Sequence, residues 1–299
     1  KIQNSMALSR VLSGIIAIAL ALGGTMLGGW YFTFFYVIII FLGQREYFNL
    51  VRAKGIAPAG KTTMVVSQVL LAICTIDSSL ADAVMPVAGT FICFYLLFQP
   101  KMASIADISA SILGLFYTGY LPSYWVRLRA IDTANFSNLP LGGYFPPSLT
   151  AFIGRENFSN LPLGLGVTLL TFMCIWAADI GAYFVGKYFG KTPLSGISPK
   201  KTVEGAIFGI TASIAVGIGV AYYINLTDFY LTGAALGSLI GIASLLGDLT
   251  ESMLKRDAGV KDSGDIIPGH GGILDRTDSY IFTAPLVYYF VTLLLPLLS

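Results

Sequence analysis

The chain has 299 residues, of which 55% are hydrophobic and 11% are charged, with a formal net charge of +2. Soluble proteins carry roughly 25% charged residues, so this composition excludes an ordinary soluble enzyme and indicates a protein that crosses a membrane several times. Cys74, Cys93 and Cys174 all lie in apolar runs, which is typical of buried thiols and not of a disulfide framework. The sequence has no Cys/His spacing of the zinc type, so any metal would be held by oxygen ligands.

A helix needs about 20 apolar residues, with a range of about 17–25, to cross a bilayer. Applied in chain order, this length predicts nine membrane helices, at 11–28, 30–43, 62–79, 81–99, 105–125, 163–186, 205–224, 229–247 and 278–298. The first is interpreted as a span and not as a signal peptide, because no clear cleavage site follows it. We therefore expect an all-α polytopic membrane protein with a single integral membrane domain over residues 1–299. Residues 1–160 would supply N-terminal helices, and residues 161–299 the catalytic helices and a polar signature segment.

The basic residues predict the orientation of these helices, because Lys and Arg in short connections favour the cytoplasmic side. With the N-terminus in the cytoplasm, 15 of the 18 Lys and Arg residues fall on that side. Only Arg127, Arg129 and Arg155 fall outside. The connection after the eighth span would then face the cytoplasm, where nucleoside triphosphates are found.

The long loop at 126–162 contains the octapeptide NFSNLPLG twice, at 135–142 and at 157–164. Proline and glycine make a helix unfavourable there. The repeat predicts two similar turns, to which the sequence attaches no chemistry.

A second polar stretch lies before the seventh span. It consists of Ser198, Lys200, Lys201, Thr202 and Glu204. Paired lysines at a helix end commonly anchor the topology. Beside Ser, Thr and Glu at a helix N-terminus, which favours anions, they can equally bind phosphate and ribose.

Asp179 lies inside the sixth span, among glycine and alanine residues that permit close helix packing. An acid inside a membrane is a candidate functional residue, because placing a charge there is costly.

The most polar part of the chain is 252–278, which holds five acidic residues, four basic residues, the single histidine and five glycines. This mixture favours a site for a polyanion that is assisted by a metal. If the eighth span continues as a helix into this segment, one face carries polar side chains at i, i+3, i+4 and i+7, namely Asp248, Glu251, Ser252 and Lys255. The alternative is an ordinary charged helix end at the membrane interface. Asp275 lies just before the last span, and one or two carboxylates can bind Mg²⁺ together with phosphate oxygens.

The segment resembles the signature of the cytidylyltransferases that form CDP-diacylglycerol, which reads Ser-x-x-Lys-Arg, Lys-Asp, His-Gly-Gly and Asp-Arg-x-Asp. The matching residues are Ser252, Lys255-Arg256, Lys261-Asp262, His270-Gly271-Gly272 and Asp275-Arg276-Thr277-Asp278. The stretch at 198–205 also resembles a recurrent element of this family, and the resemblance extends over about 175–278.

The resemblance implies that Asp248 and Asp275 hold a catalytic Mg²⁺, and it leaves a second cation open. It implies catalytic roles for Lys255, Arg256, Lys261, Asp262, His270, Arg276 and Asp278. For His270 we favour positioning or phosphate contact over proton transfer. Substrate-binding roles are implied for Asp179, Ser198, Lys200, Lys201, Thr202, Glu204 and Ser252.

The implied reaction transfers the cytidylyl group of CTP to phosphatidate, giving CDP-diacylglycerol and pyrophosphate for phospholipid synthesis. The expected partners are CTP, phosphatidate and the lipid bilayer; no nucleic acid is expected, and a homodimer is left open. The host would be a bacterial plasma membrane or an organellar membrane of the plastid type. A CTP-dependent lipid kinase is an alternative, distinguished by transfer of the γ-phosphate. An ion-coupled transporter is a further alternative, but it usually needs a repeat of spans, which the sequence does not show.

Overall fold

The computed structural model describes residues 2–146, 155–266 and 271–298, and all regular secondary structure in these ranges is helical. Six helical stretches are long and apolar enough to cross a membrane: α2 (Gly29–Ala53), α4 (Leu80–Leu97), α8 (Leu163–Phe189), α9 (Val203–Tyr223), α10 (Phe229–Asp257) and the run Leu274–Leu297. That last run contains α11 (Leu274–Ile281) and α12 (Thr283–Tyr289). The predicted all-α class is therefore confirmed for the described residues, and these six stretches are candidate membrane spans.

The predicted count of nine spans is not confirmed, although every predicted segment overlaps a helix. Two of these segments form shorter apolar helices, at Ile16–Leu27 within α1 (Ile2–Leu27) and in α3 (Gly60–Ile76). The segment predicted at 105–125 is divided into α5 (Ile105–Leu115), the π-helical turn η1 (Phe116–Tyr120) and α6 (Leu121–Ala130). It is not among the helices that are long and apolar enough to span a membrane.

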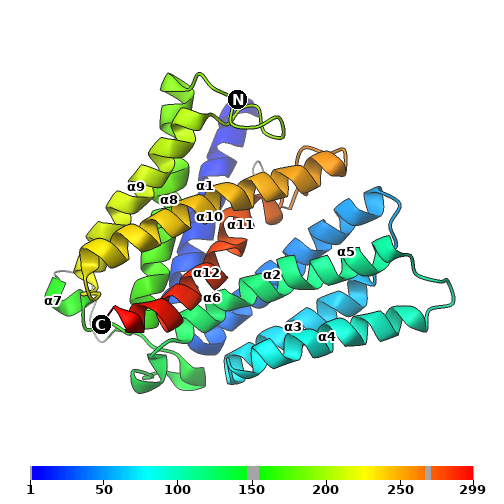
Figure 1. Cartoon of the computed structure of the whole chain (residues 1–299), viewed down its shortest axis with the longest axis horizontal. Helices are drawn as coiled ribbons and strands as arrows, with labels where there is room; N and C mark the ends of the chain where they lie inside the picture. The colour runs from blue at the N-terminus through cyan, green and yellow to red at the C-terminus, as the bar shows by residue number, and fades with distance from the viewer. Residues whose placement is uncertain (1, 147–154, 267–270, 299) are drawn as a thin grey trace. The chain divides into compact units, whose positions relative to one another are not determined.

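The described chain forms two compact units, residues 1–127 with 254–277 and residues 128–253 with 278–299. In the first unit, α2, α3, α4 and α5 lie side by side (Figure 1). Their shared core includes Ile92 and Leu96 of α4 and Leu115 of α5. Large apolar side chains such as Val69 of α3 and Phe94 of α4 are exposed, as expected of helix faces that contact lipid.

In the second unit, α8 packs along α9 and α9 packs against α10 (Figure 1). Glycines allow these close approaches. A Cβ atom at Gly209 of α9 would lie 2.6 Å from the carbonyl oxygen of Ala178 on α8, and one at Gly237 of α10 would lie 2.6 Å from Ile214 of α9. Small residues at such contacts are typical of membrane helices, because dispersion contacts between close backbones hold them together.

Two helices extend further than hydropathy predicts. Hydropathy predicts α2 at 30–43, because polar residues follow, but the helix continues to Ala53. The polar side chains of Gln44 and Glu46 are buried inside the protein and therefore do not end the helix. Helix α10 was expected to end near 247 but continues to Asp257. It stops where Gly259 adopts a positive φ of 73° and the Val260 N–H bonds to the Lys255 carbonyl, a common glycine-dependent helix end.

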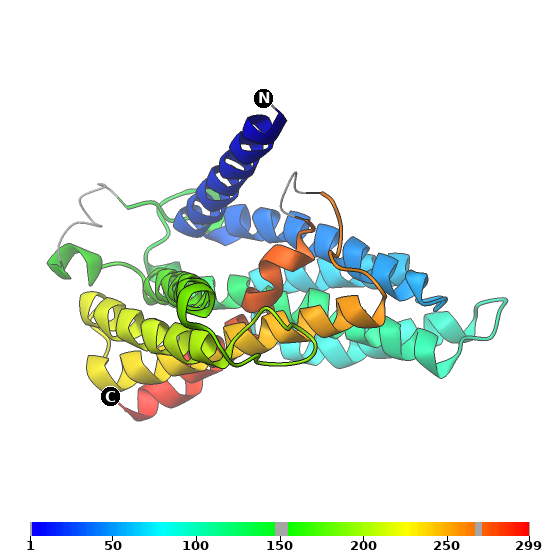
Figure 2. The same cartoon turned by 90° about the horizontal axis from the view of Figure 1, so that it is seen from above.

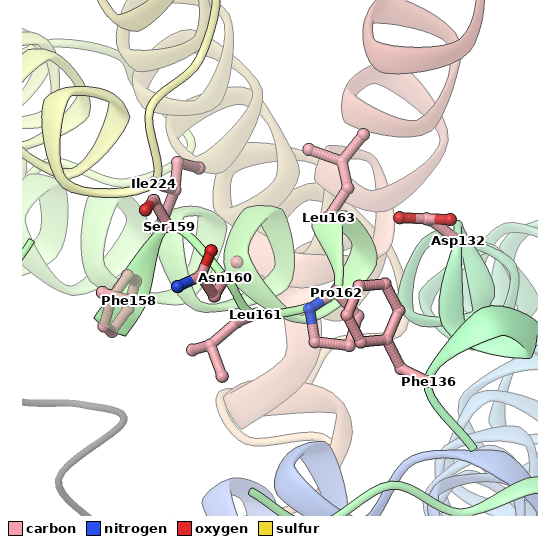
Figure 3. A pocket seen from close by; sticks show the side chains of 10 residues that line it. Asp132, Phe136, Phe158, Ser159, Asn160, Leu161, Pro162, Leu163 and Ile224 are labelled. Carbon is pink, nitrogen blue, oxygen red and sulfur yellow. The ribbon is translucent and has the colours of Figure 1, made fainter. Parts of the chain in front are cut away.

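The two copies of NFSNLPLG do not form similar turns, so that prediction was wrong. In the first copy Pro140 opens the 3₁₀ turn η3 (Pro140–Gly142). In the second copy Pro162 immediately precedes α8, because an apolar run follows and continues as a helix. Phe136 and Phe158, the second residues of the two copies, both line a cavity of about 390 Å³ in the second unit (Figure 3). The described lining of this cavity includes no residue of the signature segment.

Candidate active site

Three acidic side chains and one lysine come together in the second unit. Asp179 lies on α8, Asp248 on α10 and Asp278 on α11, and Lys201 lies in the loop before α9. Asp248 forms an ion pair with Lys201, and Asp179 and Asp278 are close enough to interact electrostatically with both of them. The structure therefore joins residues from three separate stretches that the sequence singled out.

Neighbouring hydroxyl and backbone groups contact these acids. The Ser244 hydroxyl donates to Asp179 at 3.3 Å, and the Ser252 hydroxyl lies 3.4 Å from Asp248. The backbone N–H of Ser279 donates to Asp278 at 2.7 Å. The Asp248 side chain is 33% exposed and that of Lys201 is 25% exposed, so both remain accessible to a polar ligand.

The donors of this cluster suit a hard cation that brings additional ligands with it. Within the described residues, no group of three or more Asp, Glu, His or Cys side chains is arranged to hold a metal by itself. Mg²⁺ prefers oxygen ligands and commonly binds through one or two carboxylates together with water and substrate phosphates. The carboxylates of the cluster fit that requirement.

Glu204 and Thr202, for which the sequence predicts substrate binding, form hydrogen bonds within the loop before α9 and at the start of that helix. Glu204 accepts hydrogen bonds from the backbone N–H groups of Lys191 at 3.1 Å and Thr192 at 3.2 Å, and from the Thr192 hydroxyl at 2.9 Å. Thr202 caps α9 by accepting from the Gly205 N–H at 3.2 Å. These two side chains thus fix the shape of the loop that carries Lys200 and Lys201. Lys200 is exposed, and Ser198 is partly buried.

A second cluster lies in the first unit, around Asp275 at the start of α11. Lys255 of α10 pairs with one Asp275 oxygen at 2.5 Å. The other oxygen accepts from the Ser263 N–H at 2.9 Å, the Ser263 hydroxyl at 2.9 Å and the Gly272 N–H at 2.8 Å. The Asp275 carboxylate therefore holds Ser263 and Gly272 of the signature segment in place and also pairs with the Lys255 ammonium group.

Glu46 of α2 completes this cluster, and no sequence motif marked it as a site residue. Its carboxylate accepts from the N–H groups of Ile273 at 2.9 Å and Leu274 at 2.8 Å, and it lies 3.0 Å from the Ser263 hydroxyl. Figure 2 shows the signature segment, in orange, turning back beside α2, in blue. The available signal was that Glu46 is the sole acid in α2, but its partners lie more than 200 residues away.

Four further predicted site residues lie at the protein surface. Arg256, Lys261, Asp262 and Arg276 are exposed, which leaves them accessible to a soluble ligand. Arg256 donates to the Val260 carbonyl at 3.2 Å. His270 lies outside the described residues.

Comparison with known proteins identifies the relatives of this chain. The model of the cytidylyltransferase family matches residues 8–294. A phosphatidate cytidylyltransferase of Synechocystis is 62% identical over 297 residues, which cover 98% of this chain and 99% of the relative. The chloroplastic phosphatidate cytidylyltransferase 4 of Arabidopsis thaliana is 43% identical over 298 residues, covering 97% of this chain and 74% of the relative. A phosphatidate cytidylyltransferase of Haemophilus influenzae is 46% identical over 132 residues, or 42% of this chain and 46% of the relative.

The family match spans nearly the whole chain, and the matched range includes the residues of both clusters. The chain belongs to the cytidylyltransferase family.

Proposed function

We infer that this protein transfers the cytidylyl group of CTP to phosphatidate, giving CDP-diacylglycerol and pyrophosphate. The observation that carries this conclusion is the 62% identity to the Synechocystis phosphatidate cytidylyltransferase over 98% of the chain. The polar clusters support it, because each contains a lysine that is paired with a carboxylate within an otherwise apolar protein. A lipid kinase or an ion-coupled transporter has no corresponding support.

In this reaction a phosphate oxygen of phosphatidate forms a bond to the α-phosphorus of CTP, and the bond to pyrophosphate breaks. The negative charge that develops on the phosphate oxygens needs nearby positive groups that are already in place. We assign this role to Lys201 and Lys255, which pair with Asp248 and Asp275 in the structure and would turn to phosphate oxygens when a cation takes their place on the carboxylates. The exposed Arg256, Lys261 and Arg276 would hold further phosphate oxygens.

Asp248 and Asp275 are each proposed as a ligand of Mg²⁺, which would supply neutralisation of the triphosphate and assistance to the departing pyrophosphate. For Asp248 this requires a change of partner from Lys201 to the cation. For Asp275, at least one of the four hydrogen-bond donors around it would have to give way. The most readily exchanged of these is Lys255, because the other three are fixed on the neighbouring backbone and on Ser263.

We further propose that the signature segment faces the cytoplasm or the equivalent side of an organellar membrane. This placement rests on the distribution of Lys and Arg along the chain. It would give the site direct access to CTP, while the acyl chains of phosphatidate remain in the bilayer beside apolar helix faces.

The activity can be tested with purified protein in lipid nanodiscs that contain phosphatidate, supplied with Mg²⁺ and CTP labelled in the cytosine ring. Label should appear in the lipid extract when phosphatidate is present and should be absent when diacylglycerol or phosphatidylglycerol replaces it. A protein that leaves the lipid unlabelled under all these conditions would refute the proposed function.

A further inference from the structure

Glu46 is placed unusually for an acidic residue. Its side chain lies in α2 and is part of the protein interior, with the residue only 2% exposed. A buried carboxylate is costly unless hydrogen bonds compensate for the lost water. Here the compensation comes from two backbone N–H groups and from the Ser263 hydroxyl, whose single proton is shared with Asp275, and all three groups belong to the signature segment and the start of α11.

These contacts connect Glu46 to Asp275 through a shared residue. The Ser263 hydroxyl lies 3.0 Å from a Glu46 oxygen and 2.9 Å from an Asp275 oxygen. The Ser263 N–H fixes the orientation by donating to Asp275 at 2.9 Å. Because Asp275 also holds Lys255, an unbroken series of polar contacts runs from α2 to the Lys255 ammonium group.

The glycines of the segment make this arrangement possible. A Cβ atom at Gly264 would lie 2.7 Å from a Glu46 oxygen, and one at Gly272 would overlap both the Glu46 carboxylate and the Ser263 hydroxyl. Gly272, the second glycine of His270-Gly271-Gly272, therefore leaves space for the Glu46 carboxylate. This is a steric requirement for glycine, separate from any need for a flexible turn.

We propose that Glu46 is a positioning residue, which holds Ser263 and the start of α11 so that Asp275 and Lys255 are correctly oriented for catalysis. The proposal rests on the proposed function of the signature segment, since its purpose is to position that segment. Glu46 touches neither substrate in this account, and its effect on catalysis passes through Ser263 and Asp275.

The main test compares Glu46→Gln with Gln44→Leu. Whichever way the new amide is turned, its NH₂ group faces a backbone N–H, that of Ile273 or that of Leu274. Gln44 lies on the same helix, is equally buried, and donates hydrogen bonds to Ser67 at 2.7 Å and to the Gly114 carbonyl at 3.3 Å.

Glu46→Gln should lower kcat by about tenfold or more, as the loss of one buried hydrogen bond can. It should also raise the Mg²⁺ concentration needed for half-maximal rate. The KM for phosphatidate should stay unchanged. Gln44→Leu should lower the melting temperature but leave kcat and the Mg²⁺ dependence within about twofold.

Hydrogen exchange measured by mass spectrometry provides a test that does not need activity. In Glu46→Gln, the peptide containing Ser263, Ile273 and Leu274 should exchange faster by about tenfold, consistent with lost local protection, while peptides from α8 and α9 stay unchanged. If the wild-type enzyme lacks the proposed activity, this measurement still decides whether Glu46 holds the segment.

Three further single variants and one control extend the test, and they can be measured alone if Glu46→Gln folds poorly. Glu46→Asp retains the carboxylate and should recover part of the lost rate. Ser263→Ala should reduce kcat in the same direction, and its effect should be much smaller when Glu46 is already Gln, because both act through one contact series. Gly272→Ala should also reduce kcat, whereas Gly196→Ala, at a position with open space around it, should not. Wild-type exchange of the segment in Glu46→Gln, or additive effects of Glu46→Gln and Ser263→Ala, would overturn the proposal.

Discussion

Lys255 and Asp275 form an ion pair of 2.5 Å in which the two side chains are only 12% and 8% exposed. They come from the end of α10 and the start of α11, and each belongs to a different part of the signature. A buried pair of this kind leaves an uncompensated charge when one member is removed, at a cost of about 3–5 kcal/mol. The pair is therefore expected to matter for folding as well as for catalysis.

Replacing Lys255 with methionine should lower both the melting temperature and kcat, because Asp275 is then buried without its cation. Thermal unfolding and steady-state rates in detergent or nanodiscs measure the two effects. In the double variant with Asp275→Asn, the melting temperature should recover while activity remains lost, since two neutral side chains replace the pair. A double variant that is as unstable as Lys255→Met alone would show that the pair does not behave as a buried charge pair.

Asp248→Asn should behave differently, because the Asp248 side chain is one-third exposed and its removal leaves no deeply buried charge. We expect kcat to fall by about 100-fold or more, the range observed when a group that stabilises charge in the transition state is lost. The melting temperature should change little. Near wild-type turnover at saturating Mg²⁺ in a well-folded variant would remove Asp248 from the proposed metal ligands.

The adjacent lysines before α9 provide a matched pair of variants. Lys201 pairs with Asp248, whereas Lys200 is exposed. Lys201→Ala should raise the KM for CTP by about tenfold, the effect of one charge-assisted hydrogen bond, and should leave the KM for phosphatidate nearly unchanged. Lys200→Ala should change either constant by less than about twofold, as is typical of an exposed charge. Equal effects of the two substitutions on CTP dependence would contradict the assignment of Lys201 to the site.

Several features of the site could be predicted from the sequence because they are local. The signature residues lie within 27 positions and keep a recognisable spacing, so the sequence singles out Lys255 and Asp275 as candidates without any knowledge of their contact. The pairing of Lys201 with Asp248 could not be predicted, because it depends on how α9 and α10 pack. Glu46 was missed for the same reason, since an isolated acid near the end of an apolar run has the same appearance as a charged helix end.

The prediction of the fold from the sequence was limited in the same way, because local patterns do not show tertiary contacts. Apolar runs predicted where helices form, because a helix satisfies its own backbone hydrogen bonds in lipid. They did not predict where α2 and α10 end, since Gln44, Glu46 and Ser252 are polar but are buried by tertiary contacts. The count of nine spans is not confirmed, because the segments at 11–28 and 62–79 form shorter apolar helices and the segment at 105–125 contains the π-helical turn Phe116–Tyr120.

The proposed orientation can be tested by labelling with a membrane-impermeant thiol reagent. In a variant whose Cys74, Cys93 and Cys174 are replaced by alanine, single cysteines would be introduced as Asp265→Cys and Ser137→Cys, both at exposed positions. Asp265→Cys should react only from the cytoplasmic side, and Ser137→Cys only from the opposite side. Reaction of both from the same side would contradict the orientation derived from the basic residues.

The most direct measurement of the central claim follows both ends of the nucleotide in one reaction. CTP carrying tritium in the cytosine ring and ³²P at the γ-phosphate would be incubated with the protein, Mg²⁺ and phosphatidate, and the lipid and aqueous phases then separated. Cytidylyl transfer predicts that tritium enters the lipid while all the ³²P remains in the aqueous phase as pyrophosphate, one molecule for each lipid labelled. Appearance of ³²P in the lipid without tritium would show phosphoryl transfer instead and would contradict the account.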